Sequence, residues 1–316
     1  MGRLAVTMLA AAAVLGILCA PAAATYKGRN GPIYIPFSDN GDQDTRVENL
    51  PRRSGFLEVT SPGREPAIRS HCSVEDPPPC SPRGMTFAPG GDLVAGFGPG
   101  GLTVTDRDGR DPRPLLRNAL APSWSPDGRS LVVIDARDLF VIRRDGTGLG
   151  RLTRFAVRGG DGIEDVRDPA WSPDNRIAFV HVRSERARTR AVDLLSVDPE
   201  DRSVRALARV RDAASLDWSP DGRRLLFVSG GFVHTIDRRG RGHRRLRLRA
   251  HGATWSPDGR FIAGVDRTSS VDAGSFVIAR ADGSHRRRHS LREAATGFDP
   301  DDETRGIGNP VWSPRP

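Results

Sequence analysis

A short unit that begins with Trp-Ser-Pro recurs along the 316-residue chain and limits its fold more than any other feature. Four copies join this turn signal to a dense apolar run: SWSPDGRSLVVI, AWSPDNRIAFV, DWSPDGRRLLFV and TWSPDGRFIAGV. VWSPRP ends the chain, and TFAPGGDLVAGF is a weaker copy. The anchors are 37, 47, 47, 37 and 57 residues apart, at Phe87, Trp124, Trp171, Trp218, Trp255 and Trp312. A recurrence of about 40 to 50 residues is typical of β-propeller blades.

Each unit predicts four strands: one that contains the tryptophan, an apolar strand after the turn, a strand that ends in a hairpin turn such as RRDG, and a stretch of leucine among arginines such as RRLRL. Proline and glycine suit a tight turn, and an aspartate carboxylate can bond to nearby backbone amides. We therefore interpret Asp127, Asp174, Asp221 and Asp258 as turn residues rather than catalytic acids. We expect the tryptophan to fill the wide outer gap between two wedge-shaped sheets.

Six anchors predict an all-β fold, a six-bladed β-propeller of four-stranded antiparallel blades. The last unit, Asn309 to Ser313, has no strand after its turn, whereas NGPIYIPFSD and SGFLEVTSPG near the start match the missing strands. We expect the segment from Gly31 to about Val59 to join the C-terminal strand in one mixed blade that closes the ring and covers open strand edges. Residues 25–316 would then form a single domain.

The N-terminus has the pattern of a signal peptide. Arg3 precedes an apolar run from Leu4 to Leu18, and the small residues Ala22-Ala23-Ala24 provide an Ala-x-Ala cleavage site. The sequence predicts a signal peptide over residues 1–24 with cleavage after Ala24. The apolar run is shorter than the roughly 20 residues of a membrane-spanning helix, so we expect a secreted or periplasmic protein that is not membrane-embedded.

Two cysteines follow the predicted signal peptide, Cys72 and Cys80 in CSVEDPPPC. In an oxidising compartment a close pair of this kind favours a disulfide. A redox or metal site is the alternative, with His71 as the one neighbouring ligand. The formal net charge is +9, and Lys27 is the only lysine. The excess of arginine indicates either recognition of phosphates and carboxylates or the codon usage of a GC-rich genome.

The order of Trp-Ser-Pro-Asp-Gly-Arg, apolar strand, Asp-Gly hairpin and an RLT-like step resembles the repeats of TolB-type six-bladed propellers from roughly Gly31 to Pro316. Such repeats occur in periplasmic translocation proteins, in accessory domains of peptidases and in lyases, so the resemblance implies the fold more than a function. Two departures are clear. We expect no counterpart of the α/β domain that precedes the propeller of TolB, since only a few residues separate the predicted signal peptide from the first strand, and no Gly-x-Ser-x-Gly nucleophile elbow is present in the sequence.

Propellers bind ligands at the mouths of their central channel, in loops that enter the innermost strands. Alignment of the units places polar residues there, three or four positions before the anchors: Arg83, Arg167, Asp168, Ser215, His251 and Asn309. Such a group could hold an anionic sugar, a peptide terminus or a cation, or form an ordinary water-filled channel. Lyase-like propellers hold a metal with several histidines, but His251 is the single aligned histidine, so we expect no metal and no cofactor.

Two basic clusters, Arg238 to Arg249 and His285 to His289, are predicted near the outer rim. They could bind an anionic cell-envelope polymer, or they could be solvated outer strands. Both lack stacking aromatic residues, so we expect no nucleic-acid partner.

Together these features predict a monomeric, non-catalytic scaffold that binds another envelope or secreted protein, or a ligand, at one channel mouth. One alternative is a channel-centred carbohydrate lyase-like enzyme that uses His251 with Arg83 or Arg167. The other is a binder of anionic polymers or glycans.

Overall fold

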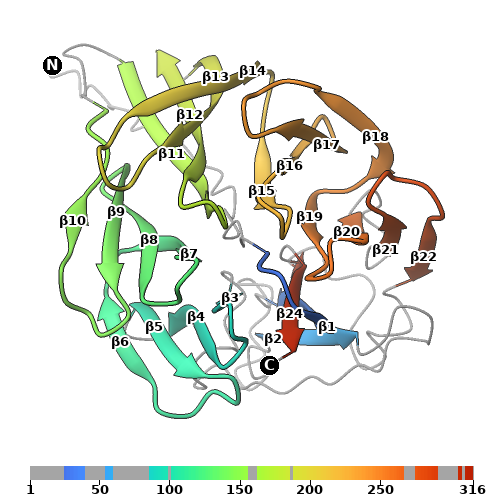
Figure 1. Ribbon diagram of the computed structural model, residues 1–316, viewed down its shortest axis with the longest axis horizontal. Coiled ribbons are helices and arrows are strands. Elements are labelled where there is room, and N and C mark those ends of the chain that lie inside the picture. Colours follow the sequence, from blue (N-terminus) through green and yellow to red (C-terminus); the bar gives the residue numbers. More distant parts are fainter. Residues whose placement is uncertain are drawn as a thin grey trace, which may run out of the picture.

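The computed structural model describes residues 25–39, 54–59, 85–98, 101–155, 162–185, 188–266, 275–290, 305–307 and 310–315. The regular elements in these segments are β-strands, and they form antiparallel sheets around a common centre (Figure 1). Across the described residues, no helix has the length and apolar character needed to cross a membrane.

Five sheets are regular blades, each a meander of four successive strands. Blade 1 comprises β3 (Met85–Phe87), β4 (Leu93–Gly98), β5 (Gly101–Asp106) and β6 (Arg113–Leu116). Blade 2 comprises β7 (Leu120–Trp124), β8 (Ser130–Asp135), β9 (Asp138–Arg143) and β10 (Gly150–Arg151). Blade 3 comprises β11 (Gly162–Trp171), β12 (Ile177–Glu185), β13 (Arg188–Val197) and β14 (Val204–Val210). Blade 4 comprises β15 (Ala214–Trp218), β16 (Arg224–Ser229), β17 (Phe232–Asp237) and β18 (Arg244–Arg249). Blade 5 comprises β19 (Gly252–Trp255), β20 (Phe261–Asp266), β21 (Ser275–Arg280) and β22 (Arg287–Ser290).

The remaining sheet, which we call the mixed sheet, joins the two ends of the chain. It contains β1 (Arg29–Asp39), β2 (Ser54–Val59), β23 (Arg305–Ile307) and β24 (Val311–Arg315). Both β23 and β24 pair with β1, at successive stretches of that strand, and β2 pairs with it as well. The predicted pairing of the C-terminal strand with the N-terminal segment is therefore confirmed.

The prediction of six four-stranded blades is wrong, because the described residues form five such blades. In the mixed sheet, β23 and β24 follow one another along β1, so among the described residues this sheet is three strands deep. Counting anchors overestimated the blades because the last anchor belongs to this sheet, which is assembled from two distant pieces of chain.

The Ser-Pro-Asp-Gly turns have the chemistry that the sequence predicts. In blade 2, Ser125 Oγ donates to Asp127 Oδ1 at 2.6 Å, and the backbone N–H of Arg129 donates to the same oxygen at 3.0 Å. The same bonds form around Asp221 and Asp258, and Asp174 accepts from the hydroxyl of the preceding serine. The four aspartates are confirmed as turn residues.

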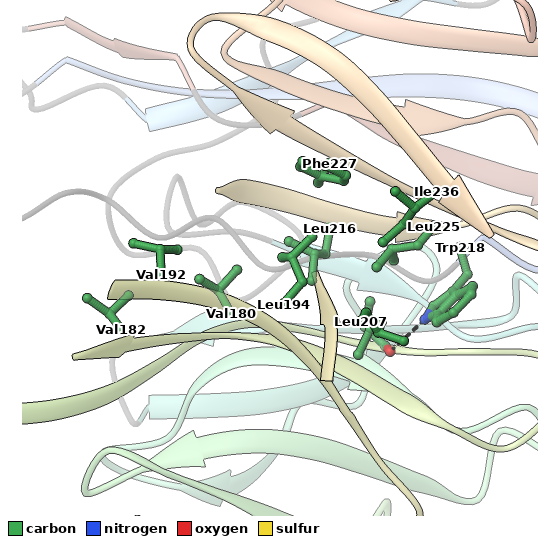
Figure 2. Packing of buried hydrophobic residues seen from close by; sticks show 12 residues of the cluster. Val180, Val182, Val192, Leu194, Leu207, Leu216, Trp218, Leu225, Phe227 and Ile236 are labelled. Atoms are coloured by element: carbon green, nitrogen blue, oxygen red, sulfur yellow. Dashed lines mark hydrogen bonds between the residues drawn. The ribbon is translucent and has the colours of Figure 1, made fainter. Parts of the chain in front are cut away.

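The apolar core lies between neighbouring sheets because the strands after the turns are covered on both faces. In β16, Leu225, Leu226 and Phe227 are fully buried. Figure 2 shows the cluster between blades 3 and 4, where Val180 and Leu194 of blade 3 lie across from Phe227 of blade 4. Comparable clusters join the other neighbouring sheets.

The tryptophans lie on the inner strands, which are nearest the centre in Figure 1. Trp218 Nε1 donates to the carbonyl oxygen of Ala170 in blade 3 at 3.1 Å (Figure 2), and Trp124 Nε1 donates to that of Thr86 in blade 1 at 3.1 Å. The prediction that these rings fill the outer gap is therefore wrong. Each of these two indoles instead links its own inner strand to that of the preceding blade.

Candidate functional site

The first two described residues, Thr25 and Tyr26, lie at the centre of the ring, where the blue segment of Figure 1 begins. The backbone N–H of Thr25 donates to Asp217 Oδ1 at 2.9 Å, and its hydroxyl donates to Asp217 Oδ2 at 2.8 Å. The Tyr26 hydroxyl donates to the carbonyl oxygen of Trp124 and lies 3.2 Å from that of Trp171. These two residues thus contact the inner strands of blades 2, 3 and 4.

Thr25 also reaches blade 5, because its hydroxyl oxygen lies 3.2 Å from the carbonyl oxygen of Trp255. Both Thr25 and Tyr26 are buried. A cavity of about 10 Å³ beside them, lined in part by Phe87 and Trp312, has the space of one water molecule. The segment therefore plugs the end of the central channel at which the inner strands finish.

In this segment, Thr25 and Tyr26, which we call the plug, Thr25 contacts the buried carboxylate of Asp217. Asp217 is 1% exposed and accepts further hydrogen bonds from Thr254 Oγ1 at 2.8 Å and from the backbone N–H of Trp255 at 2.6 Å. Burial raises the pKa of Asp217 to about 8, although its hydrogen bonds favour the ionised form. Burial, and after it the charge of Asp217, raises the pKa of Tyr26 well above its usual value. Tyr26 therefore keeps its proton and can donate it to a carbonyl.

Two predicted channel residues, Asp168 and Ser215, are bonded into the ring. Both are buried and have left-handed backbones, with φ of 48° and 56°, at irregularities in the pairing of β11 and β15. Asp168 Oδ2 accepts from the backbone N–H of Ser215 at 3.3 Å. Ser215 Oγ in turn donates to the carbonyl of Ala253 at 3.0 Å and accepts from its N–H at 2.9 Å. These bonds join the inner strands of blades 3, 4 and 5.

Two other predicted residues, Arg167 and His251, have accessible side chains where the inner strands begin. Their side chains are 35% and 43% exposed. Arg167 Nε lies 3.0 Å from Asp165 Oδ2, and His251 Nδ1 lies 3.6 Å from Asp266 Oδ1. Arg288 contacts the other oxygen of Asp266, which is 1% exposed, at 3.1 Å. The mouth opposite the plug therefore presents a cation and a histidine.

Blade 3 projects past this mouth. Strand β11 has 10 residues where β15 has 5, and the additional residues precede Arg167. At about 3.3 Å per residue, five residues extend the sheet by about 16 Å. We call this part, which consists of residues 162–166, 181–185 and 188–193, the blade 3 extension.

Charged pairs lie on the extension and on the adjoining strand β14, which carries Arg209. Asp193 contacts both Arg183 and Arg209 at 2.9 Å, and these arginine side chains are 43% and 70% exposed. On the other side of β12, His181 Nε2 lies 3.3 Å from Glu164 Oε2, and its ring stacks on Phe155 at 4.2 Å. The pairs hold the long side chains in place and leave charged groups accessible to a partner.

The remaining predicted site residues, Arg83, Asn309, Cys72 and Cys80, lie outside the described residues. Within the described segments, no group of three or more His, Cys, Asp or Glu side chains is placed to hold a metal ion. The binding role of the mouth residues stays a prediction.

The first basic cluster forms an outer strand. In β18, Leu246 and Leu248 are buried while the arginines between and beside them are exposed. Arg245 lies over the ring of Phe232 at 3.6 Å. Arg286, in the second cluster, donates to the carbonyl of Arg247 and so links the outer edges of blades 4 and 5.

A polar hollow of about 290 Å³ lies against blade 1. Its lining combines carboxylates, arginines and strand residues: Asp92, Leu93, Val104, Thr105, Asp106, Asp111, Arg113 and Arg144. Asp106 is engaged in its own turn, where it accepts from the backbone N–H of Asp108 and of Arg110. The lining of the hollow contains both carboxylates and arginines, so it does not select one class of ligand.

Sequence reasoning missed the plug and Asp217. One signal was available. The residue before each tryptophan is Ser, Ala, Asp, Thr and Val in turn, and only Asp217 is ionisable. Its partner, Thr25, lies 192 residues away along the chain, and no periodic pattern relates the two.

No protein-family model matches the chain. The uncharacterized protein Atu1656 of Agrobacterium fabrum is 31% identical over 142 residues, which are 42% of this chain and 44% of that protein. The match thus spans less than half of that relative. A TolB-like protein from Agrobacterium tumefaciens superposes with a TM-score of 0.53 at 17% identity, over 90% of this chain and 99% of that one. A chain of a nidogen–laminin complex superposes with a TM-score of 0.58 at 13% identity, over 89% and 98%. The chain thus has the fold of a TolB-like β-propeller.

Proposed function

We propose that this chain is an exported, non-catalytic TolB-like propeller that binds another protein, or a ligand, at the mouth formed by Arg167, His251 and the blade 3 extension. Export is supported by the signal-peptide pattern of residues 1–24. We also propose that the mixed sheet closes the ring, since apolar clusters join it to blade 5 and to blade 1.

The observation that carries the proposal is the difference between the two ends of the channel. At one end Thr25 and Tyr26 are buried against four inner strands. At the other end Arg167 and His251 keep a third or more of their side chains exposed. A partner that engages the channel therefore approaches from the second end, where it also meets the extension.

The chemistry of the extension favours a protein partner. Asp193, which is 14% exposed, holds the more exposed Arg183 and Arg209, so the surface offers two cations at fixed positions. Fixed cations of this kind complement an acidic protein surface and set its orientation. A chain of the same fold occurs in the nidogen–laminin complex, so the architecture is compatible with a role in protein assembly.

Site-specific photo-crosslinking in the native envelope tests the proposal. A photoreactive residue at Arg209 should capture one defined protein, identified by mass spectrometry. A matched residue at Arg223 should not, since it is 83% exposed but follows the turn at the plugged end of blade 4. In the chain with the photoreactive residue at position 209, the change Arg183→Glu should abolish the adduct, whereas Arg223→Glu should leave it. Equal capture at both positions, or none at Arg209, would contradict the proposal.

One observation favours a second candidate, an enzyme centred on the same mouth. His251 faces the buried Asp266, and a histidine beside a carboxylate is a common general base. For the lyase-like alternative, the assay is cleavage of uronate-containing polysaccharides, followed by the absorbance of the unsaturated product. Turnover that is lost in His251→Ala and in Arg167→Ala would establish the enzyme and reject the non-catalytic scaffold.

A further inference from the structure

Among the described residues, the hydrogen-bond partners of the buried Asp217 carboxylate include no cation. Its hydrogen bonds come from a peptide N–H and a hydroxyl of Thr25, a hydroxyl of Thr254 and a peptide N–H of Trp255. All of these donors are neutral as long as residue 24 is attached, because the nitrogen of Thr25 is then a peptide N–H. An ionised carboxylate that is 1% exposed is costly without a paired charge.

Independently of these contacts, the sequence predicts cleavage of the peptide bond that contains the backbone nitrogen of Thr25. The Ala22-Ala23-Ala24 motif places signal-peptide cleavage after Ala24, so Thr25 becomes the first residue. Cleavage converts its peptide nitrogen into a primary amine, with an ordinary pKa of about 8. That nitrogen lies 2.9 Å from Asp217 Oδ1.

We propose that cleavage after Ala24 creates an α-ammonium group on Thr25 that docks on Asp217 as a buried ion pair and locks the mature N-terminus into the centre of the ring. The inference rests on the proposed export, because it needs the signal peptide to be removed. It assigns Asp217 as the binding site for the chain's own new N-terminus.

The geometry suits an ammonium group better than an amide. A charged donor strengthens the bond to a carboxylate roughly twofold over a neutral one. It also offsets the burial that raises the pKa of Asp217 in the uncleaved chain. The Thr25 side chain holds the second carboxylate oxygen at 2.8 Å, so the charged bond keeps a defined orientation.

The docked terminus ties several blades together. Thr25 bonds to blades 4 and 5, and Tyr26 bonds to blades 2 and 3. In the uncleaved chain the same segment lacks the counter-charge, so the ring is less stable before processing than after it. The ring therefore reaches full stability only once the signal peptide has been removed.

A double-mutant cycle tests the ion pair. Four chains are compared by urea unfolding at pH 7: those that begin at Thr25 or at Ala24, each with Asp217 or with Asp217→Asn. Moving the amine by one residue should raise the unfolding constant about 10- to 100-fold when Asp217 is present, the contribution of a hydrogen bond to a charged group. In the Asp217→Asn background the change should be less than about threefold. An equal effect in both backgrounds would overturn the proposal.

A second measurement holds even if Asp217→Asn does not fold. Periodate cleaves the Cα–Cβ bond of an N-terminal threonine, which carries a free amine and a hydroxyl on neighbouring carbons, and leaves a glyoxylyl terminus detectable by mass spectrometry. Because the reaction requires local opening, the folded chain that begins at Thr25 should react at least about 100-fold more slowly than the urea-unfolded chain. Similar rates would show that the terminus is not docked.

Mass spectrometry of the N-terminus of the naturally exported protein separates the two proposals. If the exported protein begins at a residue other than Thr25, the cleavage step is wrong and natural maturation does not form the pair. The double-mutant cycle, on chains prepared with defined first residues, reports on Asp217 whatever the export result. The crosslinking result at Arg209 depends on neither.

Discussion

Shortening the side chain of Tyr26 tests whether the N-terminal segment holds the ring together. Tyr26 is 7% exposed, packs in the cluster between blades 1 and 2, and donates its hydroxyl proton to the Trp124 carbonyl. Tyr26→Phe removes the hydroxyl and leaves a buried carbonyl without this donor, which costs about 1 to 3 kcal/mol. Tyr26→Ala also removes the ring and leaves a cavity, for a total of about 3 to 5 kcal/mol.

The assay is equilibrium urea unfolding followed by tryptophan fluorescence, which reports on this region because Trp124 is buried in the same cluster as Tyr26. At about 2 to 4 °C per kcal/mol for a large domain, Tyr26→Ala should also lower the melting temperature by about 6 to 20 °C. The order of stability should be wild type, Tyr26→Phe, Tyr26→Ala. A Tyr26→Ala protein within about 0.5 kcal/mol of wild type would refute the plug, since a surface position gives changes of that size.

Two further outcomes follow from the structure. Gly240→Ala should destabilise by at least about 3 kcal/mol in urea unfolding and Gly242→Ala by about 1 kcal/mol. Both glycines have positive φ, 78° and 63°. A Cβ at Gly240 would strike the carbonyl oxygen of Leu207, whereas one at Gly242 meets nothing within 4 Å. Equal losses of stability in the two variants would contradict the contact between blades 3 and 4. In a chain whose Thr25 amine is acetylated, the pKa of Asp217 is about 8 when folded and about 4 when unfolded, so the folded state holds an additional proton between these values. The free energy of unfolding should then fall, by about 5 kcal/mol at most, as pH rises from about 4 to about 8. Tyr26, with its raised pKa, stays neutral throughout this range. The unacetylated chain should show little of this fall.

The turn chemistry could be predicted from sequence because it is local. Asp127 binds the hydroxyl two residues before it and the amide two residues after it, so five consecutive residues contain the whole interaction. The apolar strand that follows was predictable for the same reason. Its burial on both faces requires only that each blade has neighbours.

The blade count and the tryptophan position depend on features that the repeat does not encode. Each unit specifies a four-stranded sheet but not which edge faces the centre, so Trp218 could be assigned to either gap. The final anchor resembles the others in its residues. Its strand pairs with β1, which lies almost the whole chain length away, and the spacing of the anchors carries no information on how many strands that pairing assembles.

The channel residues show a related limit. Alignment grouped Asp168 and Ser215 with Arg167 and His251, yet the first two are bonded between blades while the others are accessible. The difference is a backbone one, since Asp168 and Ser215 have positive φ at irregular positions in their strands. A one-residue irregularity changes the direction of a side chain, and residue type alone does not reveal it.

Departures from the repeat are more informative than the repeat itself. Neighbouring blades meet through similar surfaces, so a residue whose partner is another blade can recur from unit to unit, as the turn aspartates do. A residue that contacts a single, non-repeated segment has no reason to recur. Asp217 contacts such a segment at Thr25, in addition to Thr254 and Trp255 of blade 5. Its counterparts in the other units, Ser123, Ala170 and Thr254, are not ionisable. Ser123 Oγ accepts from the Trp171 N–H just as Asp217 accepts from that of Trp255, so a hydroxyl is sufficient for the contact between blades. We therefore attribute the carboxylate at Asp217 to its contact with the backbone nitrogen of Thr25, a contact that Ser123, Ala170 and Thr254 do not make.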